Sequence, residues 1–569
     1  MKQKYLKKAA ALCMAGTLVL GLASVGGEGS ITASASDDLT TITLYPRDAN
    51  LTSGVVSGYM GDYLASLGLE VEVWAYSDEK TNAILASGDL PDIMYVSTDN
   101  LDTMIQAGML LNLDDYLDQM PHVQSYDGME TALNYVREYR SNGTGSVYAL
   151  PLVVGESSTA YELADSTDRN AVKLRWETYE AIGAPEITNM DDLLDVMAQM
   201  LEAEPTAEDG TTMYGTVLNS GSDTDYWACM TIWYRYQGYS ESELAYLLES
   251  NMVDGTVSSI LSTDSLYYQG LKWYNEAYNL GLVDPDSLNN DRATQKPKVD
   301  NGYAMVPSGY LPGWASTYLP YLVDDTTIYY NSNSPYGDQN HVIAINANTE
   351  NIEACLAFLD MLADPDAYLV SRSGPEGEFW YVDENGDAYF TEEGLAYLEE
   401  NMVGSTGFTT STGESVALWN TPFIVSNGYP TSYGDGEGGY RLPLVTAWTE
   451  YNELIAENEI YQQWIETTGY ESWQDWLAAE DAYVSESDLD YISNFESIPD
   501  DLTQLTIDAI RDVVVNASWQ MVYASSDEEF DAIWEQMVSD CEGLGAEDII
   551  EWRLEDIENA KAIRDSLAE

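Results

Sequence analysis

Hydrophobic and polar residues alternate along three short segments near the start of the chain, and segments with a helical period follow each of them. The alternation predicts strands at Thr41–Tyr45, Leu69–Tyr76 and Pro91–Ser97. Apolar positions three and four residues apart predict helices at Ser53–Leu67, Lys80–Ser87 and Leu101–Ala107. Strands that alternate with helices favour a parallel sheet with helices on its faces, so this part is predicted to be an α/β lobe.

The pattern changes after the short extended piece Tyr148–Pro151, where longer amphipathic helices begin. Capping signals precede two of these helices, at Thr188-x-x-Asp191 and Ser526-x-x-Glu529. Between them the apolar run His341–Ile345 predicts a buried strand, and a helix at Asn351–Leu362 follows it. This strand and helix have the character of the first lobe, which indicates that the chain leaves that lobe and later returns to it.

Four polar or aromatic residues lie at or just after the carboxyl ends of the predicted strands, where open α/β sheets bind ligands. They are Tyr45, Arg47, Asp78 and Ser97. Arg47 could donate hydrogen bonds to sugar hydroxyls or pair with a ligand acid, and it could equally pair with a surface carboxylate. Asp78 can accept hydrogen bonds from hydroxyls, whereas Tyr45 and Ser97 are candidates by loop position alone.

The first residues have the composition of a secretory signal, with a basic leader over Met1–Lys8 and an apolar run over Ala9–Ser24. Ala33-Ser34-Ala35 offers a signal-peptidase site, so we expect an exported chain that begins near residue 36. Leu22-Ala23-Ser24 resembles a lipoprotein processing box, but Val25 stands where the lipidated cysteine would be. We therefore expect release or loose retention at the cell surface.

The charge balance excludes one large class of partners. The chain has 22 Lys and Arg against 97 Asp and Glu, a formal net charge of −75. Nucleic acids and anionic lipids need neutralising cations, so we expect the protein to bind neither. Two histidines and four cysteines also make a zinc site, a Ser/His triad or a disulfide scaffold improbable, and we expect no metal and no cofactor.

The aromatic residues are mainly Tyr and Trp, with 43 Tyr and 15 Trp against 7 Phe. Tyr and Trp combine an apolar face with a polar edge, which suits half-wet clefts and sugar rings. Many of these rings must be structural, so the bias favours a carbohydrate ligand only weakly.

Several stretches together resemble the carbohydrate-type branch (family 1) of the extracellular solute-binding proteins of bacterial ABC importers. Five stretches carry this resemblance. They are a helix, turn and strand at Leu85–Ile93, a strand followed by a tryptophan at Asn301–Gly309, the return strand and helix at Val342–Leu362, a glycine-rich turn at Gly374–Asp387, and the closing helices at Asn516–Gly545.

The resemblance implies an α/β, two-lobed, periplasmic-binding-protein-like fold (type II) in which hinge strands join the lobes. We expect a signal peptide at 1–35, the first lobe at 36–150 and 336–375, and the second lobe at 151–335 and 376–569. Ligand contacts both lobes only when they close, so binding shifts the population to the form that the importer recognises. The implied partners are a carbohydrate ligand, expected to be an oligosaccharide, and the permease subunits of an ABC importer. We expect the protein to be a monomer.

The resemblance also adds aromatic candidates for the ligand site. Trp314 stands where sugar-binding relatives present a stacking tryptophan, and Tyr226, Trp227 and Trp233 fall in a run similar to a second aromatic wall. Trp380 and Trp419 are weaker candidates. Each of these rings could instead anchor a core.

Three other functions stay open at this point. A secreted glycoside hydrolase would use two carboxylates, and pairs of carboxylates arise by chance in so acidic a chain. A surface glycan-binding protein or sensor would bind without transport, and a relative within the same family could bind a peptide or another polar solute. The acidic run Asp383–Asp387 superficially resembles a calcium loop, but its glycine is misplaced and a hairpin turn explains it better.

Overall fold

The computed structural model describes residues 39–46, 53–126, 128–155, 171–219, 228–308, 317–364, 374–401 and 456–568, with the exception of 325, 330–333, 339, 384–387 and 485. It also describes 367, 370–371, 408–410, 413, 415–416 and 453. The predicted signal peptide and its processing sites lie outside these residues. Among the described helices, none has the length and the apolar run that a bilayer crossing needs.

The first lobe is built on a six-stranded sheet with the strand order β2-β3-β1-β4-β12-β5. The strands β1, β3 and β4 are parallel, with Leu44 of β1 beside Val73 of β3 and Ile93 of β4. The return strand β12 runs antiparallel to β4 and β5. The strands are β1 (Thr40–Tyr45), β2 (Gly54–Val55), β3 (Leu69–Val73), β4 (Ile93–Ser97), β5 (Leu150–Pro151) and β12 (His341–Ile345).

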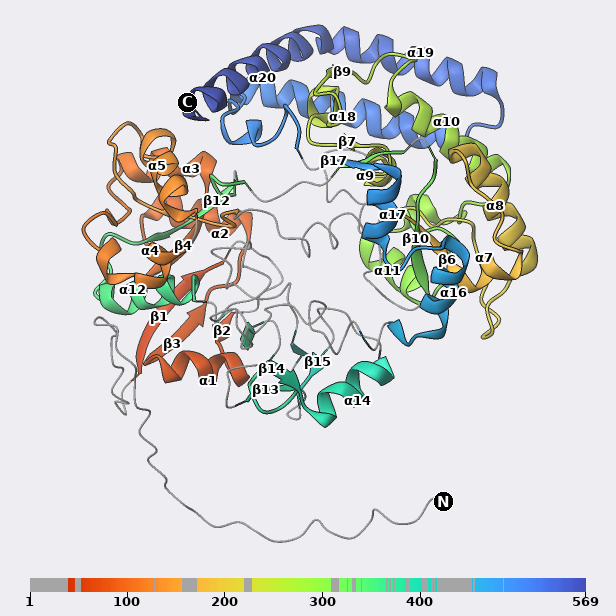
Figure 1. The fold of residues 1–569 in the computed structure, drawn as a ribbon. Coiled ribbons are helices and arrows are strands. Elements are labelled where there is room, and N and C mark those ends of the chain that lie inside the picture. Colours follow the sequence, from red (N-terminus) through yellow and green to blue (C-terminus); the bar gives the residue numbers. More distant parts are fainter. Residues whose placement is uncertain are drawn as a thin grey trace, which may run out of the picture.

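Helices cover this sheet, and two cores fill the space beneath them (Figure 1). They are α1 (Gly58–Ser66), α2 (Asp78–Ser87), α3 (Thr98–Gln106), α4 (Pro121–Ser125), α5 (Met129–Tyr139) and α12 (Ile352–Met361), with the 3-10 turn η1 (Leu117–Gln119). The predicted parallel sheet and the return of the chain to this lobe are confirmed.

Two details of the sequence prediction were wrong. Ser53–Leu67 was predicted as one helix, but Gly54–Val55 instead pair antiparallel with β3, and the helix begins only after Ser57. Gly54 has φ 136°, a conformation that glycine tolerates and a helix does not contain. The cap of the helix near residue 190 is Asn189 rather than Thr188, because the Asn189 side chain accepts hydrogen bonds from the first helical N–H groups.

The second lobe has little sheet and is mostly helical. Its helices are α7 (Trp176–Ala181), α8 (Met190–Ala203), α9 (Ala228–Arg235), α10 (Leu266–Asn279), α11 (Arg292–Asp300), α16 (Glu459–Thr468) and α17 (Trp473–Glu480). Its strands are β6 (Val172–Arg175), β7 (Tyr239–Ser240), β8 (Leu248–Asn251), β9 (Val257–Ser259), β10 (Tyr318–Tyr321), β11 (Ile328–Tyr329) and β17 (Tyr483–Val484). Its 3-10 turns are η2 (Leu244–Tyr246) and η3 (Ser287–Asn289), whereas η6 (Ile492–Asn494) packs against the core of the first lobe.

A small unit follows the return to the first lobe along the chain. The strands β13 (Trp380–Val382) and β14 (Ala388–Phe390) pair antiparallel on either side of Asp383–Asp387, as the hairpin prediction requires. The helix α14 (Glu392–Asn401) and the pair β15 (Phe408–Thr409) and β16 (Ser415–Val416) come next.

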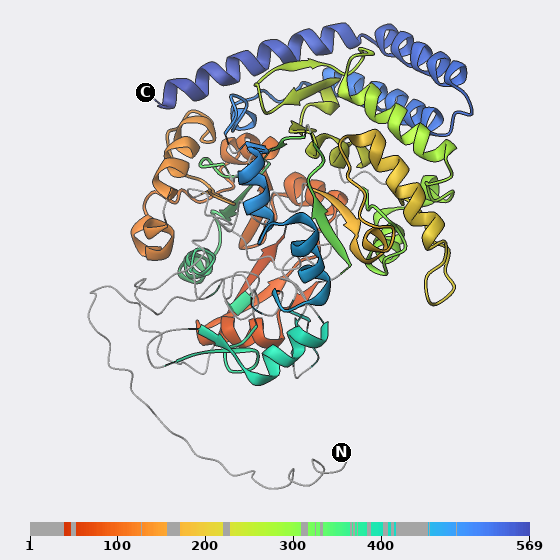
Figure 2. The ribbon, with the colours of Figure 1, turned by 45° about the vertical axis from the view of Figure 1, so that its right-hand side comes forward.

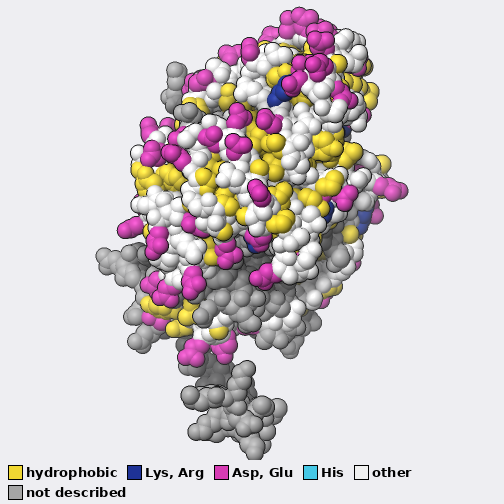
Figure 3. Space-filling model, turned by 90° about the vertical axis from the view of Figure 1, so that its right-hand side faces the viewer, with side chains coloured by type: hydrophobic (Ala, Val, Ile, Leu, Met, Phe, Trp, Pro, Cys, Tyr) yellow, Lys and Arg dark blue, Asp and Glu magenta, His cyan; other side chains and the backbone are white. Residues whose placement is uncertain are grey.

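Three long helices end the chain: α18 (Asp501–Val522), α19 (Asp527–Leu544) and α20 (Ala546–Ala568). Ser526 caps α19 by accepting a hydrogen bond from the Glu529 N–H, which confirms that capping signal. Figures 1 and 2 show α20 running from α19, above the second lobe, to the helices of the first lobe. On the face in Figure 3, acidic side chains are scattered over the described surface and basic ones are few, as the composition leads us to expect.

Candidate functional site

The carboxyl ends of β1, β3 and β4 meet at one edge of the first lobe's sheet because these three strands are parallel. The first residue of the antiparallel β12, His341, pairs with Ser97 at the same edge. We call this region the sheet edge and define it by the ends of these strands and the first turn of α2. It is the place where ligands bind in open α/β sheets.

Tyr45 lies beneath the sheet edge and not on it. Its side chain is fully buried. Its hydroxyl donates to the Ser77 carbonyl over 2.9 Å and lies 2.8 Å from the Thr81 Oγ1. Since Ser77 caps α2, Tyr45 fixes the start of that helix at the edge, which is a positioning role.

Two aromatic residues that the sequence analysis did not single out lie on the sheet edge. Trp74 and Tyr76 directly follow β3, and both are half-buried. The Tyr76 hydroxyl donates to Asp78 Oδ1 over 2.7 Å, and this bond to a carboxylate raises the pKa of the Tyr76 phenol. Their alternation with Val71 and Val73 was the available signal, because it places them on the other face of the strand, where they pack against the core cluster that contains Tyr45.

Lys80 lies over the rings of Trp74 and Tyr45. Its ammonium is 4.9 Å from the ring centroid of Trp74 and 5.7 Å from that of Tyr45. Among the described residues, no carboxylate comes within ion-pair distance of Lys80, although acids far outnumber bases in this chain. Because Lys and Arg are scarce in this chain, a cation close to the end of a predicted strand is a candidate for ligand binding. This argument applies to Lys80 as well as to Arg47.

Two further predicted residues lie at this edge. Asp78 is exposed on the first turn of α2 and accepts the Tyr76 hydrogen bond. Ser97 ends β4, is half-buried and precedes the first turn of α3. The structure therefore brings Asp78 and Ser97 to the same edge as Trp74 and Tyr76.

Two predicted tryptophans are core residues. Trp233 in α9 is 4 % exposed, donates its indole N–H to the Leu266 carbonyl over 3.1 Å and lies 5.5 Å from the ring of Trp273. Trp380 in β13 is 2 % exposed and donates to the Gly374 carbonyl over 3.0 Å. Each buried N–H has found a backbone acceptor, which is how such rings are accommodated inside a protein. The other candidates, Arg47, Tyr226, Trp227, Trp314 and Trp419, lie outside the described residues.

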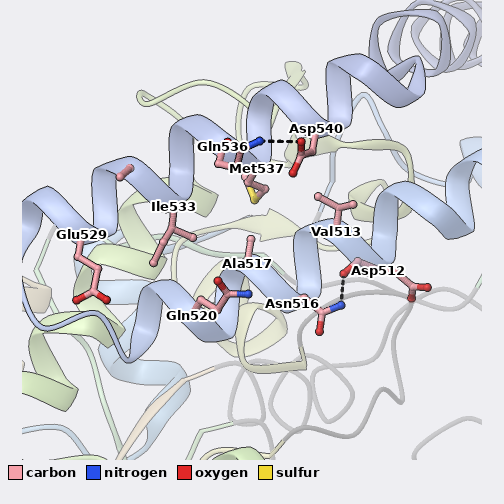
Figure 4. A pocket seen from close by; sticks show the side chains of 11 residues that line it. Asp512, Val513, Asn516, Ala517, Gln520, Glu529, Ile533, Gln536, Met537 and Asp540 are labelled. Carbon is pink, nitrogen blue, oxygen red and sulfur yellow. Dashed lines mark hydrogen bonds between the residues drawn. The ribbon is translucent and has the colours of Figure 1, made fainter.

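A pocket of about 520 Å³ lies elsewhere, in the groove between α18 and α19 (Figure 4). Its floor is apolar, with Val513, Ile533 and Met537, and its rim carries carboxylates and amides. No aromatic ring lines it, and it contains none of the predicted site residues. It therefore offers no surface on which a sugar ring would stack.

The described side chains offer no metal centre. Within the described ranges, no group of three or more His, Cys, Asp or Glu side chains could hold a metal ion. Buried acids are present, and Glu249 shows their usual role. It accepts hydrogen bonds from the Tyr234 hydroxyl and from the N–H groups of Leu266 and Tyr267, which ties β8 to the start of α10.

Solved structures with the same fold cover nearly the whole chain. An HMO-binding, ABC-transporter-associated solute-binding protein from Bifidobacterium longum infantis aligns with a TM-score of 0.58 and 16% identity, over 93% of this chain and 99% of that one. The S. pneumoniae substrate-binding protein FusA, in complex with kestose, gives a TM-score of 0.58 and 14% identity over 92% and 100%. At these identities the likeness establishes the two-lobed fold.

The alginate-binding protein AlgQ2 gives a TM-score of 0.54 and 13% identity over 92% of this chain and 99% of that one. A search of curated protein sequences finds no match. The family model for the bacterial extracellular solute-binding proteins matches residues 68–368, which is more than half of the chain. The chain therefore belongs to the bacterial extracellular solute-binding proteins.

Proposed function

We propose that the protein captures a carbohydrate between its two lobes and delivers it to the permease subunits of an ABC importer. The observation that carries this proposal is the family match together with the fold of proteins whose names include an HMO-binding protein and a kestose complex. The aromatic sheet edge adds support, because half-buried Trp and Tyr side chains are suited to sugar rings.

The proposed first-lobe contacts are Trp74, Tyr76, Asp78 and Ser97, with Lys80 above the Trp74 ring. We retain Arg47, Tyr226, Trp227, Trp314 and Trp419 as candidates for the remaining contacts. One aromatic stack contributes about 0.5–1.5 kcal/mol beyond area burial, whereas micromolar affinity needs about 8 kcal/mol. Several contacts from both lobes must therefore act together.

We infer that this function needs no catalysis, because closure of two lobes over a ligand is a binding equilibrium. A neutral glycan suits the proposed site best, since the sheet edge has one described cation and an exposed carboxylate beside it. Export is expected from the basic leader, and Val25 in place of a cysteine favours a chain without a lipid anchor. Metabolic labelling with a fatty acid would detect an anchor.

The test is thermal unfolding of the exported protein against a panel of neutral oligosaccharides. A ligand at a hundredfold excess over Kd stabilises the folded state by about 2.7 kcal/mol, so the unfolding temperature rises. A rise with one glycan that is still intact after overnight incubation supports capture without hydrolysis. A shortened glycan would show an enzyme, and no rise with any glycan would favour a peptide or another solute.

A further inference from the structure

The helix α20 crosses from the core of one lobe to the core of the other. Ala546 and Ile549, near its start, are buried in the second lobe's core. Ile557 and Ala560, farther along, are buried in the first lobe's core. Figures 1 and 2 both show this helix extending over the two parts of the molecule. Its middle, around Arg553, therefore lies where the two cores meet.

Arg553 is buried there among three carboxylates. Its Nε and Nη2 donate to the two oxygens of Glu243 over 2.6 and 3.1 Å. Its Nη2 lies 2.5 Å from Glu496 Oε2, and its Nη1 donates to Asp556 Oδ2 over 3.0 Å. The guanidinium also lies over the Tyr246 ring, 4.1 Å from its centroid. All four charged side chains are at most 8 % exposed.

These carboxylates come from different parts of the fold. Glu243 directly precedes η2, whose Leu244 is in the second lobe's core. Glu496 directly follows Phe495, which is buried in the first lobe's core against the ring of Tyr135. Asp556 belongs to α20 and accepts a hydrogen bond from the Ser497 N–H over 2.9 Å. One guanidinium therefore ties α20 to a segment of each lobe.

The cluster is short of positive charge. One arginine faces Glu243, Glu496 and Asp556, and Glu496 Oε1 is buried without a hydrogen-bond partner. An uncompensated buried carboxylate costs much more free energy than a buried protonated carboxyl. Burial, and then the charge of Glu243, raises the pKa of Glu496 to about 8.

We propose that the Arg553 cluster is a proton-controlled joint between the lobes, in which a proton held on Glu496 keeps α20 fixed to both and its loss loosens the joint. The groups that face Glu496 are Glu243 from the segment before η2 and Arg553 and Asp556 from α20, and Tyr246 of η2 faces Arg553. The joint involves no residue of the proposed ligand site, so its test needs no ligand and does not depend on the proposed function.

The direction of the pH effect follows from linkage. The folded state holds the Glu496 proton up to about pH 8, whereas the unfolded chain releases it near the usual value of 4.5. Stability from this group is therefore complete below about pH 4.5 and falls as the pH rises to about 8. Other acids at the surface are ionised throughout the upper part of this window and contribute little to the slope.

The experiment compares the full exported chain with Glu496→Gln, which keeps the shape of the side chain and removes its charge. Between pH 6.0 and 8.5 we expect the wild-type unfolding temperature to fall by about 3 °C and that of Glu496→Gln to stay level. At pH 8.5 the variant should be the more stable protein. The matched control is Glu535→Gln, an exposed position on α19, which should retain the wild-type slope.

Hydrogen exchange supplies the structural readout. At pH 8.5 the amides of α20 around Arg553 should exchange faster in the wild type than in Glu496→Gln. The amides of α10 should exchange at the same rate in the two proteins. Asp556→Asn provides a second variant. Removing the negative charge of Asp556 should move the fall in stability, which accompanies the loss of the Glu496 proton, to lower pH than in the wild type. Equal slopes in wild type and Glu496→Gln, or a Glu496→Gln chain that is less stable at pH 8.5, would overturn the proposal. A Glu496→Gln chain that does not fold, with no shift in Asp556→Asn, would overturn it too.

Discussion

Tryptophans in the two lobes have opposite environments, although both belong to an aromatic-rich sequence. Trp233 in the second lobe is 4 % exposed, and an added Cβ on Gly270 would come within 2.8 Å of its ring. Trp74 in the first lobe is half-buried at the sheet edge under the ammonium of Lys80. The difference teaches that an indole N–H paired with a backbone carbonyl marks a core residue, whereas the Trp74 ring packs against the core cluster of Tyr45 and keeps part of its surface exposed.

The largest expected effect is on the core side of this comparison. Trp233→Ala removes a buried ring and the hydrogen bond to the Leu266 carbonyl. We expect it to lower the free energy of unfolding by about 3–5 kcal/mol, measured by denaturant titration. If the variant were as stable as the wild type but lost glycan affinity, Trp233 would be a ligand residue and our placement of it in the core would be wrong.

The next effect concerns the sheet edge. Trp74→Ala should weaken glycan binding about tenfold, since the loss of one stack together with its buried area approaches 1.4 kcal/mol. Stability should change much less than in Trp233→Ala. The measurement is isothermal titration with the best glycan of the panel. Tyr278→Ala is the matched control, because Tyr278 is also a half-buried aromatic residue but packs beside Tyr523 in the second lobe, so the glycan affinity of this variant should be unchanged.

A smaller effect separates support from contact. Tyr45→Phe keeps the buried ring and removes the hydroxyl that bonds Ser77 and Thr81. We expect a loss of about 1 kcal/mol in the free energy of unfolding, with affinity changed less than in Trp74→Ala. A loss of affinity as large as that of Trp74→Ala, without any loss of stability, would place the Tyr45 hydroxyl on the ligand.

The smallest effect is expected from Lys80→Met. The methionine keeps an apolar chain over Trp74 and removes a cation–π contact of about 0.5–1 kcal/mol. The free energy of unfolding should fall by no more than about 1 kcal/mol, and the affinity for a neutral glycan should change less than tenfold. If an acidic glycan lost far more affinity than a neutral one of the same length, the ligand would carry an anionic group and the preference for neutral sugars would be wrong.

The local pattern of the sequence predicted much of the first lobe. The strand His341–Ile345 was placed at its observed bounds, and β1 and β4 within two residues, because each is an apolar run with clear limits. The start of α1 was misplaced because the pairing of Gly54 with β3 is a long-range contact that no local period reveals. Such pairing depends on tertiary structure, which propensity alone does not encode.

The site was harder to predict than the fold. The positions of Asp78 and Ser97 after predicted strands correctly placed both residues at the sheet edge. Position alone could not show that the Tyr45 side chain is buried and hydrogen-bonded to Ser77 at the start of α2. Composition indicated that Trp and Tyr would matter and did not distinguish Trp74 from Trp233, because burial and the partner of each N–H are set by the packing of distant segments. The acid-rich cluster at Arg553 likewise joins two residues, Arg553 and Glu243, that are 310 positions apart.

The most direct test of the central claim is a crystal structure of the protein with the glycan that raises its unfolding temperature. The account predicts that a sugar ring lies at the sheet edge against Trp74 or Tyr76, with the second lobe closed over it. A glycan bound in the groove between α18 and α19, or anywhere away from the carboxyl ends of β1, β3 and β4, would contradict it.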